Sequence, residues 1–150
     1  MNKEFSEREA RVRESFSRQG FMRHLGAEVT KLGPGECEIQ VPYREELTQQ
    51  HGYFHAGVAA AIADSACGYA AYGLMPATSS VLTVEYKINL VAPAAGEVLV
   101  ARARVLRSGK TLKICAADVF AVKDGKETLC ATRKHNISRL GDLTSFSTES

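Results

Sequence analysis

Hydrophobic and polar positions along this chain follow two periods, helical in the middle and strand-like on both sides. Residues 55–72 are small and apolar at nearly every position, which predicts one long buried helix with a single carboxylate, Asp64. At about 100° per residue, one stripe of this helix is expected to face a sheet: Val58, Ile62, Ser65, Tyr69 and Tyr72. A second flank is nearly bare, so another surface can approach its backbone: Gly57, Ala60, Asp64, Gly68 and Ala71.

Alternation with period two predicts six strands. A hairpin at 27–32 and 37–41 precedes the helix, and four strands joined by tight turns follow it at 83–90, 98–106, 112–122 and 128–137. In the strand at 83–90, we expect a dry face of Val84, Tyr86, Ile88 and Leu90 and a wet face of Thr83, Glu85, Lys87 and Asn89. These elements predict an α+β fold, in which an antiparallel sheet of about six strands wraps around one long central helix.

An extra helix is predicted at the N-terminus. Ser6 and Glu9 have the spacing of a capping box, which predicts a helix from about Ser6 to Arg18. A chain of 150 residues is long enough for one domain with a real core. We therefore expect an N-terminal helical extension at 1–25, the α+β domain at 26–138, and a disordered tail rich in Ser and Thr at 139–150.

Charge and cysteine content narrow the class of ligand and the compartment. The net charge of +2 does not indicate nucleic-acid binding, but residues 87–139 hold eleven Lys or Arg against four Asp or Glu. These basic residues either meet an anionic ligand such as a nucleotide phosphate or form solvated outer faces of strands. The four cysteines lack metal-ligand spacing, which predicts a cytoplasmic protein without a bound metal. The hydropathy predicts neither a signal peptide nor a membrane span, so no membrane partner is expected.

Asp64 is the candidate chemical group of the central helix. An unpaired carboxylate on a buried helix lowers the stability of the fold by several kcal/mol. Asp64 is therefore either a hydrogen-bonded structural residue or a functional acid. Signatures of other chemistries are missing, because no serine lies in a GxSxG motif and neither a P-loop nor a Rossmann fingerprint is present. The residues around Asp64 therefore decide its role.

A spaced pattern precedes Asp64. Gln49 lies fifteen positions before it, Gly52 twelve before it, and His55-Ala56-Gly57 begins nine before it. With this pattern, and with its later strands and turns, the chain resembles the hotdog-fold acyl-CoA thioesterases of the PaaI type over roughly residues 25–138. The family usually has Asn in place of Gln49 and Gly in place of Ala56, although a related aryl-CoA branch has Gln.

The resemblance implies a hotdog fold and a thioester-hydrolysing site. Asp64 would activate water or attack the thioester carbonyl itself, and both mechanisms stay open. The backbone N–H groups of Ala56 and Gly57, at the start of the helix, would polarise that carbonyl. Gln49 would orient the water or the carboxylate, and Thr83 would help to hold the water.

The two halves of this site are expected on different subunits. Asp64 lies about 10 Å along the helix from Ala56 and Gly57, which is too far for both to act on one carbonyl. The family's arrangement implies that Asp64 comes from one subunit, and the helix start with His55 and Gln49 from its partner. A homodimer with shared sites, assembled as a dimer of dimers, is therefore the expected state.

Coenzyme A is part of the expected substrate, so no separate cofactor is predicted. Its phosphates need cationic partners, for which Lys87, Arg107 and Lys110 are the candidates; Arg107 and Lys110 flank a turn. His51 is expected only to shape its loop. The predicted activity is hydrolysis of a medium-chain or aryl-acyl coenzyme A. The alternatives are a non-catalytic acyl-CoA-binding module and a hydratase or dehydratase in which His55 or His51 is the base.

Overall fold

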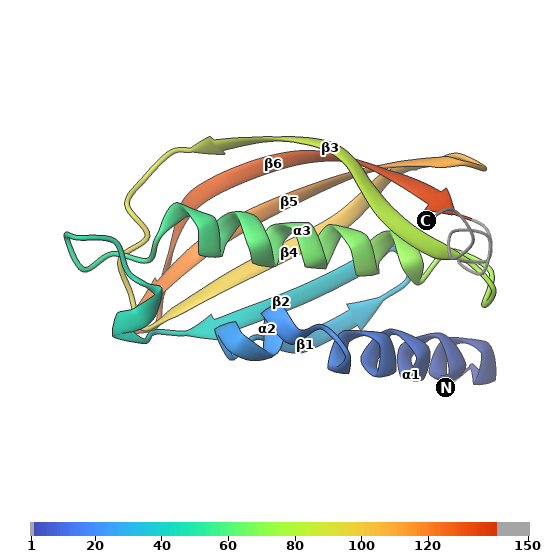
Figure 1. Ribbon diagram of the computed structural model, residues 1–150, viewed down its shortest axis with the longest axis horizontal. Coiled ribbons are helices and arrows are strands. Elements are labelled where there is room, and N and C mark those ends of the chain that lie inside the picture. Colours follow the sequence, from blue (N-terminus) through green and yellow to red (C-terminus); the bar gives the residue numbers. More distant parts are fainter. Residues whose placement is uncertain (1, 141–150) are drawn as a thin grey trace, which may run out of the picture.

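A curved antiparallel sheet wraps around one long helix in the computed structural model, which describes residues 2–140 (Figure 1). The helix is α3 (Ala56–Tyr72). The strands are β1 (Glu28–Gly33), β2 (Glu36–Pro42), β3 (Ser80–Leu90), β4 (Val98–Ser108), β5 (Leu112–Lys123) and β6 (Lys126–Leu140). Neighbouring strands are antiparallel in the order β1-β2-β4-β5-β6-β3, so β1 and β3 are the sheet edges. The predicted α+β architecture is confirmed.

The core forms where the sheet packs on α3. Ile62, Ala63, Ala66 and Cys67 of this helix are fully buried, and the small side chains of Ala63, Ala66 and Cys67 let β2, β4 and β5 approach its backbone. The predicted sheet-facing stripe is buried except for the half-buried Tyr72, and the bare flank is accessible except for Ala71. All four cysteines are buried and free. No helix within residues 2–140 is long and apolar enough to span a membrane.

The N-terminal extension folds into two helices, α1 (Lys3–Ser17) and α2 (Gly20–Leu25), beside the β1 edge (Figure 1). The predicted start at Ser6 is wrong. Asn2 is the N-cap, and its side chain accepts a hydrogen bond from the Glu4 N–H at 3.2 Å. Asn is as good an N-cap as Ser, so the helix begins three residues earlier than the capping box indicates.

Arg11 joins α1 to the end of α3. Its Nη2 donates to the carbonyl oxygens of Tyr72 at 3.0 Å and Met75 at 2.9 Å. The last carbonyls of a helix have no partner within it, so this guanidinium satisfies groups that would otherwise need water. The Arg11 guanidinium also lies 4.5 Å from the centroid of the Tyr72 ring. α1 is therefore fixed against the C-terminal half of α3.

The predicted dry face of the strand at 83–90 is right for Tyr86 and Ile88, which face α3, and wrong for Val84. A β-bulge at Val84 lets Thr83 pair with Ile137 and Tyr86 with His135, so Thr83 and Tyr86 both point toward α3. Val84 and Leu90 are 58% and 57% exposed. The bulge breaks the period of two between Thr83 and Glu85. As an edge strand, β3 has no strand paired to its free side within residues 2–140.

β4, β5 and β6 lie where the sequence predicts strands, and each is longer than predicted. Asp124 and Gly125 have positive φ values of 51° and 75°, as the predicted hairpin turn between β5 and β6 requires. β6 continues to Leu140, so the first two residues of the predicted tail belong to a strand. The rest of that tail, residues 141–150, lies outside the described residues.

Replacing Arg11 by Met should destabilise the protein by about 1–2 kcal/mol, because it leaves two part-buried carbonyl groups without their donor. The free energy of unfolding, measured by urea denaturation, tests this. Arg8→Met is the matched control, since Arg8 has only the exposed Glu4 as its partner in α1. An exposed pair of this kind contributes about 0.3–0.5 kcal/mol. Equal losses in the two variants would contradict the role given to Arg11.

Candidate active site

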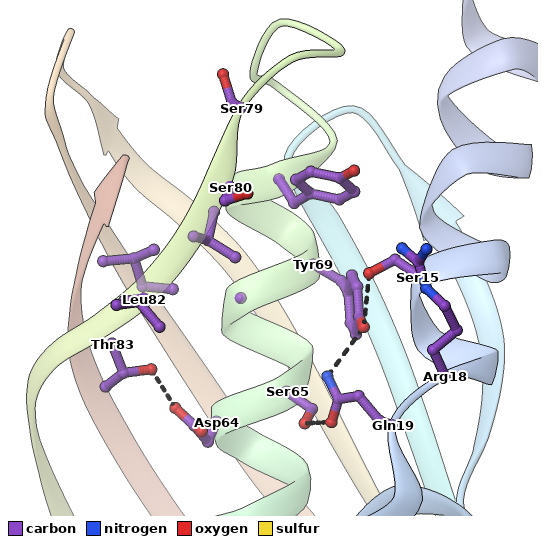
Figure 2. Close-up of a pocket in the computed structure, with 14 residues that line it drawn as sticks. Ser15, Arg18, Gln19, Asp64, Ser65, Tyr69, Ser79, Ser80, Leu82 and Thr83 are labelled. Carbon is purple, nitrogen blue, oxygen red and sulfur yellow. Dashed lines mark hydrogen bonds between the residues drawn. The ribbon is translucent and has the colours of Figure 1, made fainter. Parts of the chain in front are cut away.

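Asp64 lines an open cleft of about 390 Å³ between α3, the N-terminal helices and the start of β3 (Figure 2). Ser15, Arg18 and Gln19 contribute from the helical side. Leu82 and Thr83 contribute from β3 on the opposite side. The N-terminal extension is therefore part of the wall of the cleft that contains the candidate acid.

The Asp64 carboxylate is held through one of its two oxygens. Thr83 Oγ1 donates to Asp64 Oδ1 at 2.7 Å, and His135 Nε2 lies 3.0 Å from the same oxygen. Arg133 Nη2 is 3.5 Å from it. Every hydrogen bond that the described residues give to this carboxylate ends on Oδ1, so Oδ2 is the oxygen left for a substrate or a water molecule.

Behind Asp64, the guanidinium of Arg133 and the imidazole of His135 form a buried layer. Both side chains are 0% exposed, and they lie two residues apart on β6, facing α3. Tyr86 covers both: its ring stacks on His135 with centroids 5.6 Å apart, and the Arg133 guanidinium carbon lies 3.2 Å from its centroid. Arg133 also donates to the carbonyl oxygen of Ala60. His135 Nε2 is also 3.0 Å from Thr83 Oγ1, whose own hydrogen is donated to Asp64. Both oxygens near Nε2 can therefore only accept, so His135 carries a hydrogen on Nε2.

These contacts favour the ionised form of Asp64. Burial raises the pKa of the carboxyl group, but the hydrogen bonds from His135 and Thr83 and the nearby positive charge of Arg133 outweigh it. The pKa of Asp64 is consequently below its ordinary value. Burial also lowers the pKa of Arg133, yet a guanidinium stays protonated. The site therefore contains a carboxylate at neutral pH.

Sequence reasoning missed Arg133 and His135. The available signal was the alternation in β6, where Ala131, Arg133, His135 and Ile137 occupy the positions that face α3. Two polar residues at consecutive inward positions of an otherwise apolar strand indicate a buried partner of opposite charge. The family resemblance predicts that Thr83 helps to hold a water molecule. In the structure, Thr83 lies beside Asp64 and contacts the carboxylate itself.

A second pocket lies at the start of α3. It has a volume of about 330 Å³, its walls are mainly apolar, and it includes Gln49, Ala56, Phe54 and Leu90. Neither Asp64 nor Thr83 lines this pocket, so the predicted site residues fall into two separate groups within one chain.

Of the two backbone N–H groups predicted to polarise the thioester carbonyl, Ala56 and Gly57, the one of Gly57 already has a partner within the chain. His55 is the N-cap, and its Nδ1 accepts from the Gly57 N–H at 2.8 Å while its carbonyl oxygen accepts from Val58. The Ala56 N–H is not among the hydrogen-bonded groups of residues 2–140. Gln49 Oε1 accepts from the His51 N–H, which keeps the preceding loop tight. Ala56 is thus the donor that a ligand could use.

The three cationic residues predicted to bind coenzyme A lie apart from both cavities. Lys87, Arg107 and Lys110 are exposed and line neither the Asp64 cleft nor the pocket at the start of α3. Lys87 pairs across the strands with Lys134 of β6. Within residues 2–140, no three His, Cys, Asp or Glu side chains gather closely enough to hold a metal ion.

Comparison with known proteins identifies the family. The sequence pattern of the Thioesterase superfamily matches residues 51–128, just over half of the chain. This chain belongs to the thioesterase superfamily. A thioesterase family protein from Silicibacter pomeroyi has a similar crystal structure, with 45% identity, a TM-score of 0.88, and coverage of 89% of this chain and 98% of that one. Membership makes the six-stranded sheet around α3 the hotdog fold that the resemblance implied.

Other similar proteins are more distant in sequence. The PaaI protein of E. coli, from the phenylacetic acid degradation operon, shares the fold with a TM-score of 0.80 and 18% identity, over 90% of this chain and 94% of that one. A relative from Halobacterium salinarum with an esterase name is 32% identical over 70% of this chain and 72% of its own. The 1,4-dihydroxy-2-naphthoyl-CoA hydrolase of Listeria monocytogenes is 23% identical over 76% of this chain and 91% of its own.

Replacing Thr83 by Val should raise the pKa of Asp64, because it removes a hydroxyl group that donates to the ionised form. A carboxyl-carbon NMR titration measures this midpoint directly. Thr132→Val is the matched control, since Thr132 neighbours Arg133 on β6 and therefore points to the opposite face of the sheet. An unchanged Asp64 midpoint in Thr83→Val would contradict the electrostatic account of this site.

Proposed function

We propose that this thioesterase superfamily member hydrolyses acyl-CoA thioesters, with Asp64 as general base or nucleophile. The observation that carries the proposal is the state of this carboxylate, which is ionised, open to a cleft, and bonded through Oδ1 alone. A purely structural Asp would have both oxygens satisfied or solvated away from any cavity. The 1,4-dihydroxy-2-naphthoyl-CoA hydrolase among the relatives supports an aryl-CoA substrate, and a medium-chain acyl-CoA is the other candidate.

We further propose that each site is shared between two subunits of a homodimer. β3 is an edge strand of eleven residues without proline, and Leu82, Val84 and Leu90 on it are each more than half exposed. Such an edge favours pairing with another strand. Antiparallel pairing of β3 with its copy would continue the sheet and bring the two α3 helices side by side in opposite directions. Asp64 of one subunit would then lie near Ala56 of the other.

In this arrangement the chemistry divides between the two subunits. The Ala56 N–H and the positive end of the α3 dipole would bind the thioester oxygen and stabilise the oxyanion that forms on it. In the general-base mechanism, Asp64 Oδ2 takes a proton from water while the water oxygen adds to the carbonyl carbon. Collapse of the tetrahedral intermediate breaks the C–S bond, and the proton passes from Asp64 to the coenzyme A thiolate.

The nucleophilic mechanism uses the same atoms in another order. Oδ2 would add to the carbonyl carbon, coenzyme A would leave as the thiolate, and water would then hydrolyse the resulting anhydride. In either case Thr83 and His135 keep Oδ1 fixed, so that Oδ2 points at the reacting carbon. Gln49, at the edge of the pocket that contains Ala56, would orient the water or the thioester, and Lys87, Arg107 and Lys110 remain the candidates for coenzyme A phosphates.

Asp64→Asn should lower the rate of thiol release from acyl-CoA by about 10²–10⁴-fold, because it removes the base or nucleophile while keeping the hydrogen-bond acceptor. Asp118→Asn, which alters a partly exposed carboxylate 3.9 Å from Arg104 and outside the cleft, is the control and should retain full activity. Equal rates in wild type and Asp64→Asn would contradict the catalytic role. Binding of acyl-CoA without thiol release by wild type would indicate the non-catalytic module instead.

Ala56→Pro should reduce activity by about 10²–10³-fold, because it deletes the backbone donor. Proline is favoured at the first position of a helix, and the φ of −62° and ψ of 139° at His55 suit a residue before proline. The melting temperature should therefore stay close to that of wild type. Ala56→Ser keeps the N–H group and should remain active. A fully active, folded Ala56→Pro would exclude this donor.

A further inference from the structure

Arg133 carries a buried charge that the packing of the fold does not require. Its side chain has no exposed surface, and within residues 2–140 Nη1 donates to the carbonyl oxygen of Ala60 while Nε and Nη2 are buried without a hydrogen-bond partner. Burying a cation with unpaired N–H groups is unfavourable, and an apolar side chain of similar volume is often equally stable in such a place. The stability of the sheet therefore does not explain this arginine.

Arg133 also has no route to a direct contact with substrate. Its guanidinium is enclosed by the Tyr86 ring, the Ala60 carbonyl and Asp64, and it lines neither the Asp64 cleft nor the pocket at the start of α3. The charged group that it faces is Asp64, whose Oδ1 lies 3.5 Å from Nη2. Arg133 can therefore influence the reaction only through this carboxylate.

Other titratable or charged groups near Asp64 cannot supply a constant positive charge. Within residues 2–140 they are His135 on β6, Tyr86 on β3, Cys67 and Tyr69 on α3, Cys115 on β5 and Arg18 after α1. Thiols and phenols are never cationic, and histidine changes its charge in the physiological range. Arg18 is mostly exposed and pairs with Glu14 at 3.2 Å. Among these groups and Arg133, only Arg133 combines a permanent positive charge with full burial.

We infer that Arg133 is a positioning residue of the reaction, which holds Asp64 Oδ1 toward β6 and keeps the free oxygen, Oδ2, negatively charged as the solution becomes acidic. This inference rests on the proposed thioesterase activity. Thr83 and His135 orient the carboxylate by hydrogen bonds, while Arg133 supplies the charge that opposes its protonation. Solvent and salt ions do not reach the guanidinium, so they screen this interaction only weakly. Activity is therefore expected to extend to lower pH than an aspartate without this neighbour would allow.

Removing the charge of Arg133 should move the acid limb of the pH–rate profile to higher pH. The specificity constant kcat/KM for thiol release from benzoyl-CoA and octanoyl-CoA is measured against pH for wild type, Arg133→Met and Arg133→Gln, of which the second keeps N–H donors. Both variants should raise the midpoint of the acid limb by about one pH unit, because the ionised form of Asp64 loses a neighbouring positive charge. Arg133→Lys keeps a charge and should stay close to wild type. At about pH 8, where Asp64 is ionised in every variant, kcat/KM should change by less than about tenfold.

Arg104→Met is the matched control, since it removes an exposed cation from the outer face of β4 and changes the net charge by the same amount. It should keep the wild-type profile. Thermal melts at each pH restrict the comparison to conditions in which each variant is folded. Folded Arg133→Met and Arg133→Gln with the wild-type acid limb would overturn the inference and leave the proposed function intact. An equal loss of kcat/KM at every pH would overturn it too. Absence of thiol release by wild type would instead overturn the proposed function.

Discussion

The contact between the Asp64 carboxylate and the buried pair of Arg133 and His135 is the interaction on which the site depends. A guanidinium with no exposed surface needs a counter-charge, and Asp64 Oδ1, the Ala60 carbonyl and the Tyr86 ring surround it. Removing one partner of a buried pair typically costs about 3–5 kcal/mol, although the partial exposure of Asp64 reduces that figure here. The structural and functional interpretations of Asp64 are therefore compatible, because one oxygen stabilises the fold and the other faces the cleft.

The rest of the fold makes this contact possible. The small residues of α3 let the sheet curve closely around the helix, so that side chains of β6 reach a residue on the accessible flank of α3. The bulge at Val84 turns Thr83 and Tyr86 toward α3, which gives Asp64 its hydroxyl donor and covers Arg133 with an aromatic ring. α1, fixed by Arg11, closes the opposite side of the cleft. Each of these features positions groups around one carboxylate.

The sequence predicted the architecture well, because hydrophobic periodicity and the turns at Gly33-Pro34-Gly35 and Asp124-Gly125 are local properties. It predicted the neighbourhood of Asp64 and Thr83 only through a family resemblance. Arg133 and His135 were missed because their meeting with Asp64 depends on strand register and sheet curvature, which no local pattern specifies. The sides of Thr83 and Val84 were mispredicted for a related reason, since the bulge at Val84 interrupts the alternation, whereas Tyr86 and Ile88 face α3 as predicted.

Mixing two inactive variants tests most directly whether each site combines Asp64 of one subunit with Ala56 of the other. Asp64→Asn and Ala56→Pro, separately tagged, are unfolded together, refolded, and assayed for thiol release, with native mass spectrometry to count mixed dimers. A shared site predicts one intact site in each mixed dimer, and so about a quarter of the wild-type activity at random association of equal amounts. Activity no higher than that of the separate variants, in the presence of mixed dimers, would contradict the account.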